Sequence, residues 1–541
     1  MRRHRYHGTL PAQIAFIALA ARRAIKSDGT VVMTMKHFTR HSPTEAAGWL
    51  FTLQNTIGGA RHRHMKQCKL IVAALGLTTT PALAAANDAS MAAVQLSQIA
   101  NSDNASQSTA EPIASLSSPA TSASTAQPVA ERFAVHGQST FTVQGTPRFA
   151  SPYSGTNSLA PKQVKETFDV TLFLGARLWH GAELWVNPEI DQGFGLSNTL
   201  GVAGFPSGEA YKVGKANPYF KLTRLFLRQT IDLGGDRNAV DAAANQLAGS
   251  QSANRLVFTL GKFGVVDVFD TNAYAHDPRG DFLNWALIDT GSFDYAANAW
   301  GYTFGGSAEW YHGPWTLRAG LFDLSKVPNQ PSLEIDFSQY QVNGELEHRH
   351  TIAGHPGAIR AGFFLTRGRL TKLADAIALY DATGAIPADL TPLRHYRNKW
   401  GIQLNAEQEV SAALGLFLRA GYGDGKSEAD DFTDIDRTVA VGGQLKGNSW
   451  GRAADRIGFA GIVNGISGLH RQFLADGGLG TLVGDGALPH PGAELIVESY
   501  YDWQVIHHVN LTFDYQFVSN PGYNRDRGPA HVFALRFHVG I

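Results

Sequence analysis

The strongest constraint on the fold is an alternation of polar and apolar residues with a period of two. In LTFDYQFV (residues 511–518), the leucine and the aromatic residues fall on one side of an extended chain, and Thr512, Asp514 and Gln516 fall on the other. Successive side chains of a β-strand point to opposite faces of its sheet, so this pattern predicts a strand with one apolar and one polar face. Similar segments, separated by Gly, Asn, Asp and Pro, fill the chain after Glu131.

The segment FDVTLFLGARLWHGAELWVNPEID (residues 168–191) predicts two such strands joined by a tight turn. We predict a three-residue loop of Trp179, His180 and Gly181, with the glycine at the position that needs a positive φ, so that Leu178 pairs with Ala182. The polar face then continues in register through both strands. It carries Asp169, Thr171, Phe173, Gly175, Arg177, Trp179, Glu183, Trp185, Asn187, Glu189 and Asp191.

A related hexapeptide recurs and tests the two-faced interpretation independently. LRAGLF begins at Leu317, IRAGFF begins at Ile359 and LRAGYG begins at Leu418. In each copy apolar residues flank the arginine, which therefore lies on the polar face. The three arginines are Arg318, Arg360 and Arg419.

Alternation alone does not distinguish a soluble β-fold, with its apolar face inside, from a membrane barrel, with that face toward lipid. Three features favour the barrel: an export signal, no cysteine after that signal, and a strand pattern in HVFALRFHVGI (residues 531–541) that continues to the last residue. A closed barrel also leaves no unpaired strand edge in hydrocarbon. We therefore predict an all-β transmembrane antiparallel barrel over residues 131–541, with the soluble β-fold as the alternative.

Strand length predicts the number of strands. Strands of about ten residues, joined alternately by short turns and longer loops, use roughly 25 residues each, which gives about 16 strands for residues 131–541. An even number places both barrel termini on the periplasmic side of an outer membrane. YHGPW (residues 311–315) is expected to form a short turn on that side, and residues 421–436 are expected to form an outer loop.

The region before the barrel has the composition of an export signal and a linker. Basic residues around Met65, the apolar run LIVAALGL and a small-residue cleavage pattern predict a signal peptide over residues 65–84. Residues 1–64 are then a leader without a structural role and translation starts at Met65, with a long leader as the alternative. Residues 85–130, dominated by Ala, Ser, Thr, Gln and Asn, predict a flexible low-complexity segment.

Cysteine usage and charge exclude other classes of protein. The single cysteine, Cys68, precedes the apolar run of the signal, so the exported chain has none, and neither disulfides nor soft-metal chemistry is expected. The basic excess lies mainly in the leader and the exported chain is net acidic. Nucleic acid is therefore not an expected partner.

Signals for enzymatic chemistry are weak. His348 and His350 share a strand face without an evident third ligand, so no metal site is expected. DDFTDIDR (residues 430–437) is acidic enough for adventitious Ca²⁺ but lacks EF-hand spacing, and GGLGTLVGDG (residues 477–486) misses the dinucleotide fingerprint and predicts a turn. We expect no cofactor and no catalysis, with an outer-membrane hydrolase as the minority alternative.

A barrel of this size encloses an aqueous lumen, so its inward-facing residues form the candidate site. Arginine facing lipid at the bilayer midplane costs roughly 2–4 kcal/mol, so the arginines should face the pore and donate hydrogen bonds to hydroxyl-rich solutes. The alternative is that they pair with inward carboxylates and brace the wall. Inward aromatic residues such as Phe173 and Trp185 suit the apolar C–H face of a pyranose, or else pack beneath an inward-folded loop.

The segment GKFGVVDVFDTNAYAHDPRGDFLNW (residues 261–285) begins as a strand and becomes too polar for hydrocarbon. It predicts a loop whose polar groups either meet a sugar or fix the loop's own turns. The predicted pore-lining and substrate-binding residues of the whole chain are Arg177, Trp185, Glu189, Asp191, Arg228, Asp270, Asn272, Asp277, Arg279, Asn284, Arg318, Arg360 and Arg419.

Several long blocks resemble the carbohydrate-selective porins of Gram-negative outer membranes, the OprB type. They are NPEIDQGFGLSNTLGVAGFPSGEAYKVG (residues 187–214), the segment 261–285, FTDIDR (residues 432–437) and LTFDYQFVSNPGYNRDRGP (residues 511–529). The resemblance runs from about Phe133 to the end of the chain. It implies a 16-stranded barrel that passes monosaccharides, glucose-like sugars first, by facilitated diffusion.

The expected partners are sugars, the lipid bilayer and the outer-membrane assembly machinery. A homotrimer and a monomer are both left open. The main alternative function is a non-selective general porin or a structural barrel whose charged lumen only braces the wall.

Overall fold

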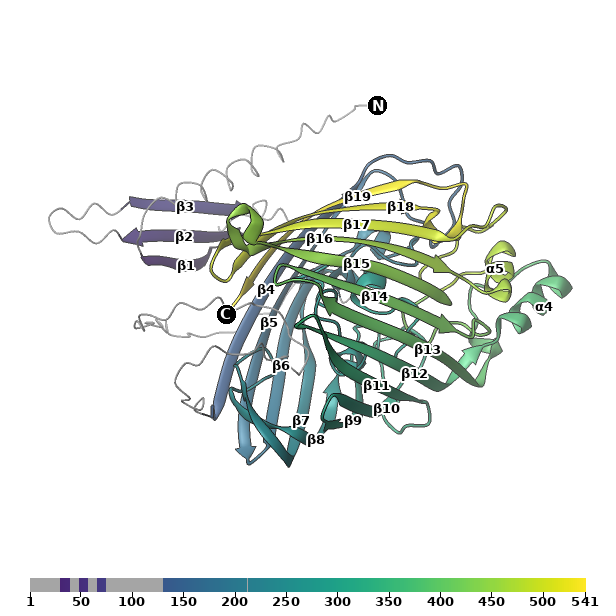
Figure 1. Ribbon diagram of the computed structural model, residues 1–541. Helices are drawn as coiled ribbons and strands as arrows, with labels where there is room; N and C mark the ends of the chain where they lie inside the picture. The colour runs from purple at the N-terminus through teal and green to yellow at the C-terminus, as the bar shows by residue number, and fades with distance from the viewer. Residues whose placement is uncertain (1–29, 39–47, 57–65, 74–129, 212) are drawn as a thin grey trace, which may run out of the picture. The chain divides into compact units, whose positions relative to one another are not determined.

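The computed structural model describes residues 30–38, 48–56, 66–73, 130–211 and 213–541 (Figure 1). They belong to two units, one within residues 1–103 and the other within residues 104–541. The described part of the first unit is an antiparallel sheet in the order β1–β2–β3. Its strands are β1 (Thr30–Phe38), β2 (Gly48–Thr56) and β3 (Lys66–Ala73).

The predicted leader and signal peptide overlap this sheet. β1 and β2 fall within residues 1–64, and β3 falls within residues 65–84. Most of the predicted flexible segment, residues 85–129, lies outside the described residues. The export signal, the translation start and the boundaries between these segments therefore stay predictions.

The second unit contains a closed antiparallel barrel of sixteen strands, in which each strand pairs with its neighbours in sequence and β19 pairs with β4 (Figure 1). The strands are β4 (Phe133–Thr146), β5 (Gln163–Trp179), β6 (Ala182–Gly193), β7 (Lys215–Val240), β8 (Gly249–Phe263), β9 (Thr303–His312), β10 (Trp315–Asp323), β11 (Tyr340–Ile352), β12 (His355–Thr371), β13 (Arg394–Glu409), β14 (Leu414–Gly423), β15 (Arg437–Gly447), β16 (Arg452–Gly465), β17 (Glu494–Ile506), β18 (Val509–Ser519) and β19 (Ala530–Gly540). The predicted fold class and strand number are confirmed.

The apolar face of the wall points outward. Leu172, Leu317 and Phe513, from three separate strands, are 44%, 49% and 51% exposed, whereas the adjacent Thr171 and Arg318 are buried. A soluble β-fold would bury the apolar set instead, so that alternative is excluded. The polar residues of each strand consequently face the interior of the barrel.

The connections between strands alternate in length around the barrel. At one end, which we call the short-turn end, they are residues 180–181, 241–248, 313–314, 353–354, 410–413, 448–451 and 507–508. At the other, the long-loop end, they are residues 147–162, 194–214, 264–302, 324–339, 372–393, 424–436, 466–493 and 520–529. YHGPW forms a short turn as predicted. The predicted loop 421–436 begins later, at residue 424, because β14 continues to Gly423.

The turn between β5 and β6 differs by one residue from the prediction. Trp179, not Leu178, pairs with Ala182, which leaves a two-residue turn that ends in Gly181. This glycine has a φ of 76°, the left-handed conformation predicted for it. Leu178 becomes a bulge that absorbs the missing loop residue, so the pairing from Arg177 onward is the predicted one.

Short helices occupy several connections. They are the α-helices α2 (Gly208–Tyr211), α3 (Trp285–Ile288), α4 (Leu373–Thr383) and α5 (Gly468–Ala475), and the 3₁₀ helices η1 (Leu196–Asn198), η2 (Val265–Asp267), η3 (Thr391–Leu393), η4 (Asn448–Trp450) and η5 (Pro521–Tyr523). α4 and α5 lie side by side beyond the long-loop end (Figure 1). Across the described residues, no helix combines the length and apolar character needed to cross a membrane.

Candidate functional site

One long connection folds into the barrel. Residues 264–302, which join β8 to β9 and which we call the lumen loop, bury most of their side chains. Their backbone contacts inward-facing side chains of β11, β13, β14, β17 and β19, which lie on other parts of the wall. The sequence predicted a loop here, and the structure shows that the loop turns inward and narrows the lumen.

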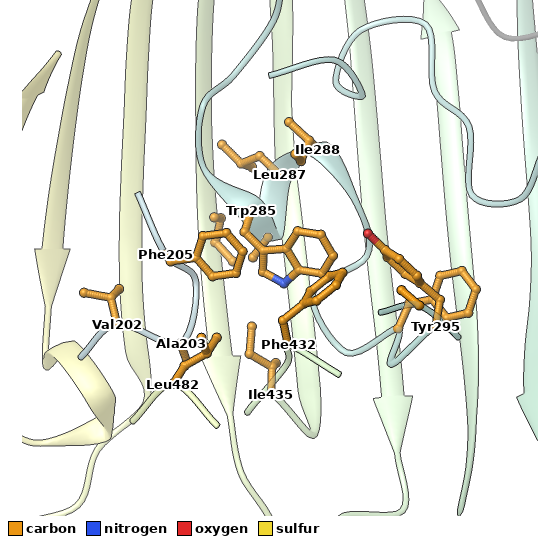
Figure 2. Close-up of a cluster of buried hydrophobic side chains, with 14 of the residues drawn as sticks. Val202, Ala203, Phe205, Trp285, Leu287, Ile288, Tyr295, Phe432, Ile435 and Leu482 are labelled. Atoms are coloured by element: carbon orange, nitrogen blue, oxygen red, sulfur yellow. The ribbon is translucent and has the colours of Figure 1, made fainter. Parts of the chain in front are cut away.

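Aromatic side chains from three loops form an apolar cluster inside the lumen (Figure 2). Trp285 of α3 stacks on Phe205 from the β6–β7 loop, with ring centroids 5.3 Å apart and an interplanar angle of 8°. Phe432 from the β14–β15 loop meets Trp285 edge-on at 4.9 Å and packs on Tyr295 at 5.2 Å. These contacts join segments that are distant in sequence into one packed body.

Wall carboxylates hold these loops by their backbone N–H groups. Glu498 on β17 accepts hydrogen bonds from the N–H groups of Leu283 at 2.6 Å and Asn284 at 2.9 Å. Glu494, on the same strand, accepts hydrogen bonds from the N–H groups of Ala203 at 3.0 Å and Gly204 at 2.8 Å in the β6–β7 loop. Burying a carboxylate is unfavourable unless such charge-assisted hydrogen bonds replace its water.

Wall arginines hold the lumen loop by its carbonyl groups. Arg419 on β14 is fully buried and donates to the carbonyl oxygens of Ala275 at 2.6 Å and Asp270 at 3.0 Å. Arg536 on β19 is also fully buried and donates to the carbonyl oxygen of Pro278 at 2.5 Å. Arg419, predicted from its hexapeptide to face the lumen, does face it and anchors the loop there.

Three of the predicted loop residues also hold the loop in place. The Asp270 carboxylate accepts hydrogen bonds from the Thr290 N–H at 2.5 Å and from Asn405 on β13 at 2.7 Å. Asn272 donates to the side-chain oxygen of the same Asn405 at 2.8 Å. Asn284 caps α3 by accepting a backbone N–H bond at 3.1 Å. These contacts correspond to the alternative in which the polar groups fix the loop itself.

The other two hexapeptide arginines belong to a buried ion-pair network. Arg318 lies 2.7 to 3.2 Å from three carboxylates of β9 and β11. These carboxylates are Glu309, Glu345 and Glu347. Arg360 on β12 shares Glu347 at 2.9 Å and contacts Glu407 on β13 at 3.0 Å. The network crosses five neighbouring strands, which corresponds to the alternative in which these arginines brace the wall.

The predicted residues of β6 are buried against its neighbours. Lys221 on β7 lies 3.3 Å from Glu189 and 3.0 Å from Asp191. Trp185 is fully buried, and its ring lies so close to Gly175 on β5 that a Cβ at that position would be 2.5 Å from the ring. The glycine is therefore required for the indole to lie against β5.

A cavity of about 180 Å³ lies between the lumen loop and the wall formed by β5, β7 and β8. Arg228, Asp277 and Arg279, all predicted site residues, line it. The lining also includes Phe173, which the sequence indicated as an inward aromatic residue suited to a pyranose, and Arg224, Phe226, Thr259 and Tyr302, which the sequence did not indicate. The cavity thus combines aromatic side chains with charged hydrogen-bonding groups.

The charges around the cavity are mostly paired. Arg279 lies 3.1 to 3.5 Å from three carboxylates, which are Asp169, Glu189 and Glu209. Burial raises the pKa of Asp277, but the charge and the backbone N–H of Arg279 more than offset it and hold this pKa below its usual range. Arg228 lies 3.7 Å from the Glu183 carboxylate, and its Nε has no hydrogen-bond partner among the described residues.

The β7–β8 connection borders the cavity at the short-turn end. Residues 241–248 fold inward, and three of them line the cavity. Arg228 donates to the carbonyl oxygen of Asn245 at 2.8 Å. The Glu131 carboxylate accepts a hydrogen bond from the N–H of Ala248, the last residue of the connection, at 2.8 Å. Arg177 donates to the Glu131 carbonyl oxygen at 2.9 Å. Arg177, predicted to line the pore, therefore lies beside the β7–β8 connection at the short-turn end.

The predicted metal-binding candidates have other partners. Asp434, within DDFTDIDR, accepts hydrogen bonds from the backbone N–H groups of residues 481–483 at 2.6 to 3.2 Å. The rings of His348 and His350 lie 6.1 Å apart. In the part of the chain that the structure describes, no group of three or more His, Cys, Asp or Glu side chains is arranged to hold a metal ion.

A histidine–aspartate pair joins α5 to the β14–β15 loop outside the strands. His470 Nδ1 lies 3.1 Å from Asp436, whose carboxylate also accepts the Ser467 N–H at 2.6 Å. Burial lowers the pKa of His470, but Asp436 and Asp434 outweigh it and raise this pKa. Burial raises the pKa of Asp436, but His470 and Ser467 outweigh it and lower that pKa.

These two shifts predict a pH window for the docking of α5. The contribution of His470 to the stability of docked α5 is complete below the ordinary histidine pKa of 6.5. It is lost as pH rises through the raised pKa of His470. The contribution of Asp436 is complete above its ordinary pKa of 3.8 and is lost as pH falls through its lowered value. The protection factors for hydrogen exchange at residues 468–475, which remove the intrinsic pH dependence of exchange, should therefore be largest between about pH 4 and 6.5. His470→Gln should remove the loss on the alkaline side, and a loss that persists in this variant would contradict the assignment.

Comparison with known proteins agrees with this architecture. A family model described as carbohydrate-selective porin, OprB family, matches residues 156–540. No curated protein shows significant similarity to the sequence. The high-pH structure of Pseudomonas putida OprB is 17% identical with a TM-score of 0.58, and the match covers 76% of this chain and 94% of that one.

Two further solved structures are more distant. The low-pH structure of Pseudomonas putida OprB is 14% identical with a TM-score of 0.42, over 76% of this chain and 93% of that one. The outer-membrane channel DcaP of Acinetobacter baumannii is 10% identical with a TM-score of 0.41, over 76% of this chain and 97% of that one.

The fold and the family model point to an outer-membrane channel rather than an enzyme. The chain belongs to the OprB family of carbohydrate-selective porins.

Proposed function

We propose that this porin passes monosaccharides, glucose-like sugars first, by facilitated diffusion, and that the cavity beside the lumen loop is where they bind. The observation that carries the proposal is that the Arg228 Nε and the Thr259 hydroxyl, both buried and both on residues that line the cavity, have no hydrogen-bond partner among the described residues. Buried donors without a partner are unfavourable, so a hydroxyl-bearing solute that pairs with them is stabilised.

The aromatic lining supports the same class of solute. Phe173, Phe226 and Tyr302 line the cavity, and the C–H face of a pyranose is weakly apolar. The Arg228 guanidinium lies 5.2 Å from the centre of the Phe226 ring, so an apolar platform and a donor lie side by side. A ring with hydroxyl groups around its rim matches both.

Location and affinity complete the proposal. The lumen loop borders the cavity on one side and residues 241–248 border it near the short-turn end, so a solute in the narrowed lumen passes close to the unpaired donors. Flux requires binding strong enough to load the site and weak enough to release it. A dissociation constant near 1 mM, about 4 kcal/mol, meets both needs.

The orientation and assembly of the barrel belong to the same proposal. Both barrel termini lie at the short-turn end, which we assign to the periplasm because outer-membrane barrels have short periplasmic turns and longer extracellular loops. The outer-membrane assembly machinery would insert the chain, as a monomer or a homotrimer. A protease added outside intact cells should cut residues 372–393 and leave residues 448–451 untouched.

Conductance in planar bilayers tests the sugar site. Glucose should block the ion current in a concentration-dependent manner. Arg228→Gln should raise the half-blocking concentration about tenfold, because a hydrogen bond from a charged donor contributes about 1.5 kcal/mol. Arg255→Gln is the matched control: its guanidinium also stacks on an aromatic ring and its Nε is also unpaired among the described residues, but it does not line the cavity.

The alternatives give different results in the same preparations. A non-selective or structural barrel would show no concentration-dependent block by glucose, and Arg228→Gln would behave like Arg255→Gln. An outer-membrane hydrolase would cleave lipids or glycosides, whereas the purified channel should cleave neither.

A further inference from the structure

Two grooves cross the outward, lipid-facing surface of the barrel. The first has a volume of about 730 Å³ and spans β12 to β16. Its lining includes small residues and larger aliphatic residues, among them Ala361, Ala420, Ile402, Leu404, Val439 and Val463. The second, of about 560 Å³, lies over β8 to β10 and is lined by Leu260, Phe304 and Leu321 among others.

Once the barrel is in a bilayer, a groove in this position is filled by apolar groups of the surrounding membrane. Water in hydrocarbon lacks hydrogen-bond partners, and an empty space forfeits the dispersion contacts of its lining. A flexible acyl chain can follow a groove of this kind, whereas a flat wall offers fewer contacts. Both grooves therefore favour an acyl chain, and their shape alone does not select among lipids.

The first groove has a cation at its long-loop end. Arg437, the first residue of β15, lines the groove, is exposed, and lies 5.6 Å from the centre of the Tyr422 ring. The Tyr422 ring lies 5.8 Å from that of Trp400, so the arginine adjoins an aromatic pair of the kind that marks a membrane interface. Within residues 130–211 and 213–541, no carboxylate forms an ion pair with Arg437. The second groove has no cationic residue in its lining.

We propose that the groove beneath Arg437 is a binding site for an anionic lipid whose headgroup carries a phosphate. The guanidinium donates two hydrogen bonds to the phosphate, a geometry that suits arginine better than lysine. One acyl chain of the same lipid lies along Ala420 and Val439 in the groove. The ring of Tyr422 keeps the guanidinium at the level of the headgroups. The site is independent of the sugar pathway, because it lies on the outer face of the wall.

Native mass spectrometry of the purified barrel tests the site with phosphatidylglycerol and phosphatidylcholine as probes. The wild type should retain phosphatidylglycerol in preference to phosphatidylcholine. Arg437→Gln should reduce this preference about fivefold, the effect of one arginine near an anionic headgroup. Arg367→Gln is the matched control, because Arg367 is also exposed, also stacks on a tyrosine, at 5.3 Å from Tyr396, and does not line the groove.

A second variant separates the groove from the cation. Ala420→Phe fills the groove and should reduce retention of both lipids while Arg437 stays in place. Equal retention by Arg437→Gln and the wild type, or equal effects of Arg437→Gln and Arg367→Gln, would overturn the proposal. So would a spectrum in which the wild type is an oligomer that Ala420→Phe dissociates without changing lipid retention, since the groove would then be covered by a second copy of the chain.

Discussion

Glu498→Ala is expected to release the lumen loop and raise the ion conductance of the barrel. The substitution removes the acceptor for the Leu283 and Asn284 N–H groups, which lie 2.6 and 2.9 Å from the carboxylate. Each hydrogen bond to a charged group contributes about 1.5–3 kcal/mol, and the two donors would stay buried without a partner. Single-channel conductance and hydrogen exchange at residues 283 and 284 measure the release.

Two further variants make this expectation specific. Glu498→Gln keeps one carbonyl acceptor and should give an intermediate conductance. Glu309→Ala also removes a buried lumen carboxylate, but Glu309 contacts Arg318 and Tyr311 rather than the loop backbone. It should destabilise the wall without faster exchange at residues 283 and 284. Unchanged conductance and exchange in Glu498→Ala would refute the anchoring role.

Arg318→Ala is expected to be the most destabilising substitution in the wall. It leaves three buried glutamates, at 2.7 to 3.2 Å from the lost guanidinium, without their shared cation. Breaking a buried ion pair by removing one partner costs about 3–5 kcal/mol, because the remaining charge stays desolvated. The concentration of urea that unfolds the barrel in detergent, followed by the mobility shift between folded and unfolded forms in gels, measures the loss.

The neighbouring arginine gives a test of the network. Arg360 shares Glu347 with Arg318, so the double variant should lose less than the sum of the two single losses. Arg318→Lys, which keeps the charge but not the forked donor geometry, should fall between the wild type and Arg318→Ala. Arg471→Ala, on the exposed surface of α5, should change stability by no more than about 0.5 kcal/mol. Additive losses in the double variant would contradict a shared network.

Much of the wall was predictable because it depends on local periodicity. A strand whose side chains alternate between two faces shows that alternation in sequence, so Leu172 and Thr171 could be assigned to opposite faces, and the number of strands followed from their spacing. The one-residue error at the β5–β6 turn has a local cause as well. A bulge at Leu178 and a longer loop are equivalent in sequence, since both leave the pairing of Arg177 with Glu183 unchanged.

The interior could not be predicted in the same way because its contacts join distant segments. Glu498 and Leu283 are 215 residues apart, and nothing in either segment alone identifies the other as its partner. The alternation placed Arg318 and Arg360 on the inward face correctly, but it gave no information on whether carboxylates or solvent would meet them there. The aromatic side chains within residues 282–300 were the available signal that the loop packs inside the barrel, because large aromatic side chains are usually buried rather than exposed to water.

The anchoring of the lumen loop has a consequence for how such a channel can diversify. Glu498, Arg419 and Arg536 form hydrogen bonds with peptide groups of the lumen loop, which nearly every amino acid supplies equally. Apart from Asp270, Asn272 and Asn284, whose side chains hold the loop, substitutions in residues 264–302 can therefore alter the chemistry presented to a solute while the wall groups that position the segment stay in place. Proline is an exception, because it lacks the N–H that Glu498 accepts at 283 or 284 and the N–H that Glu345 or Glu407 accepts at 270 or 273.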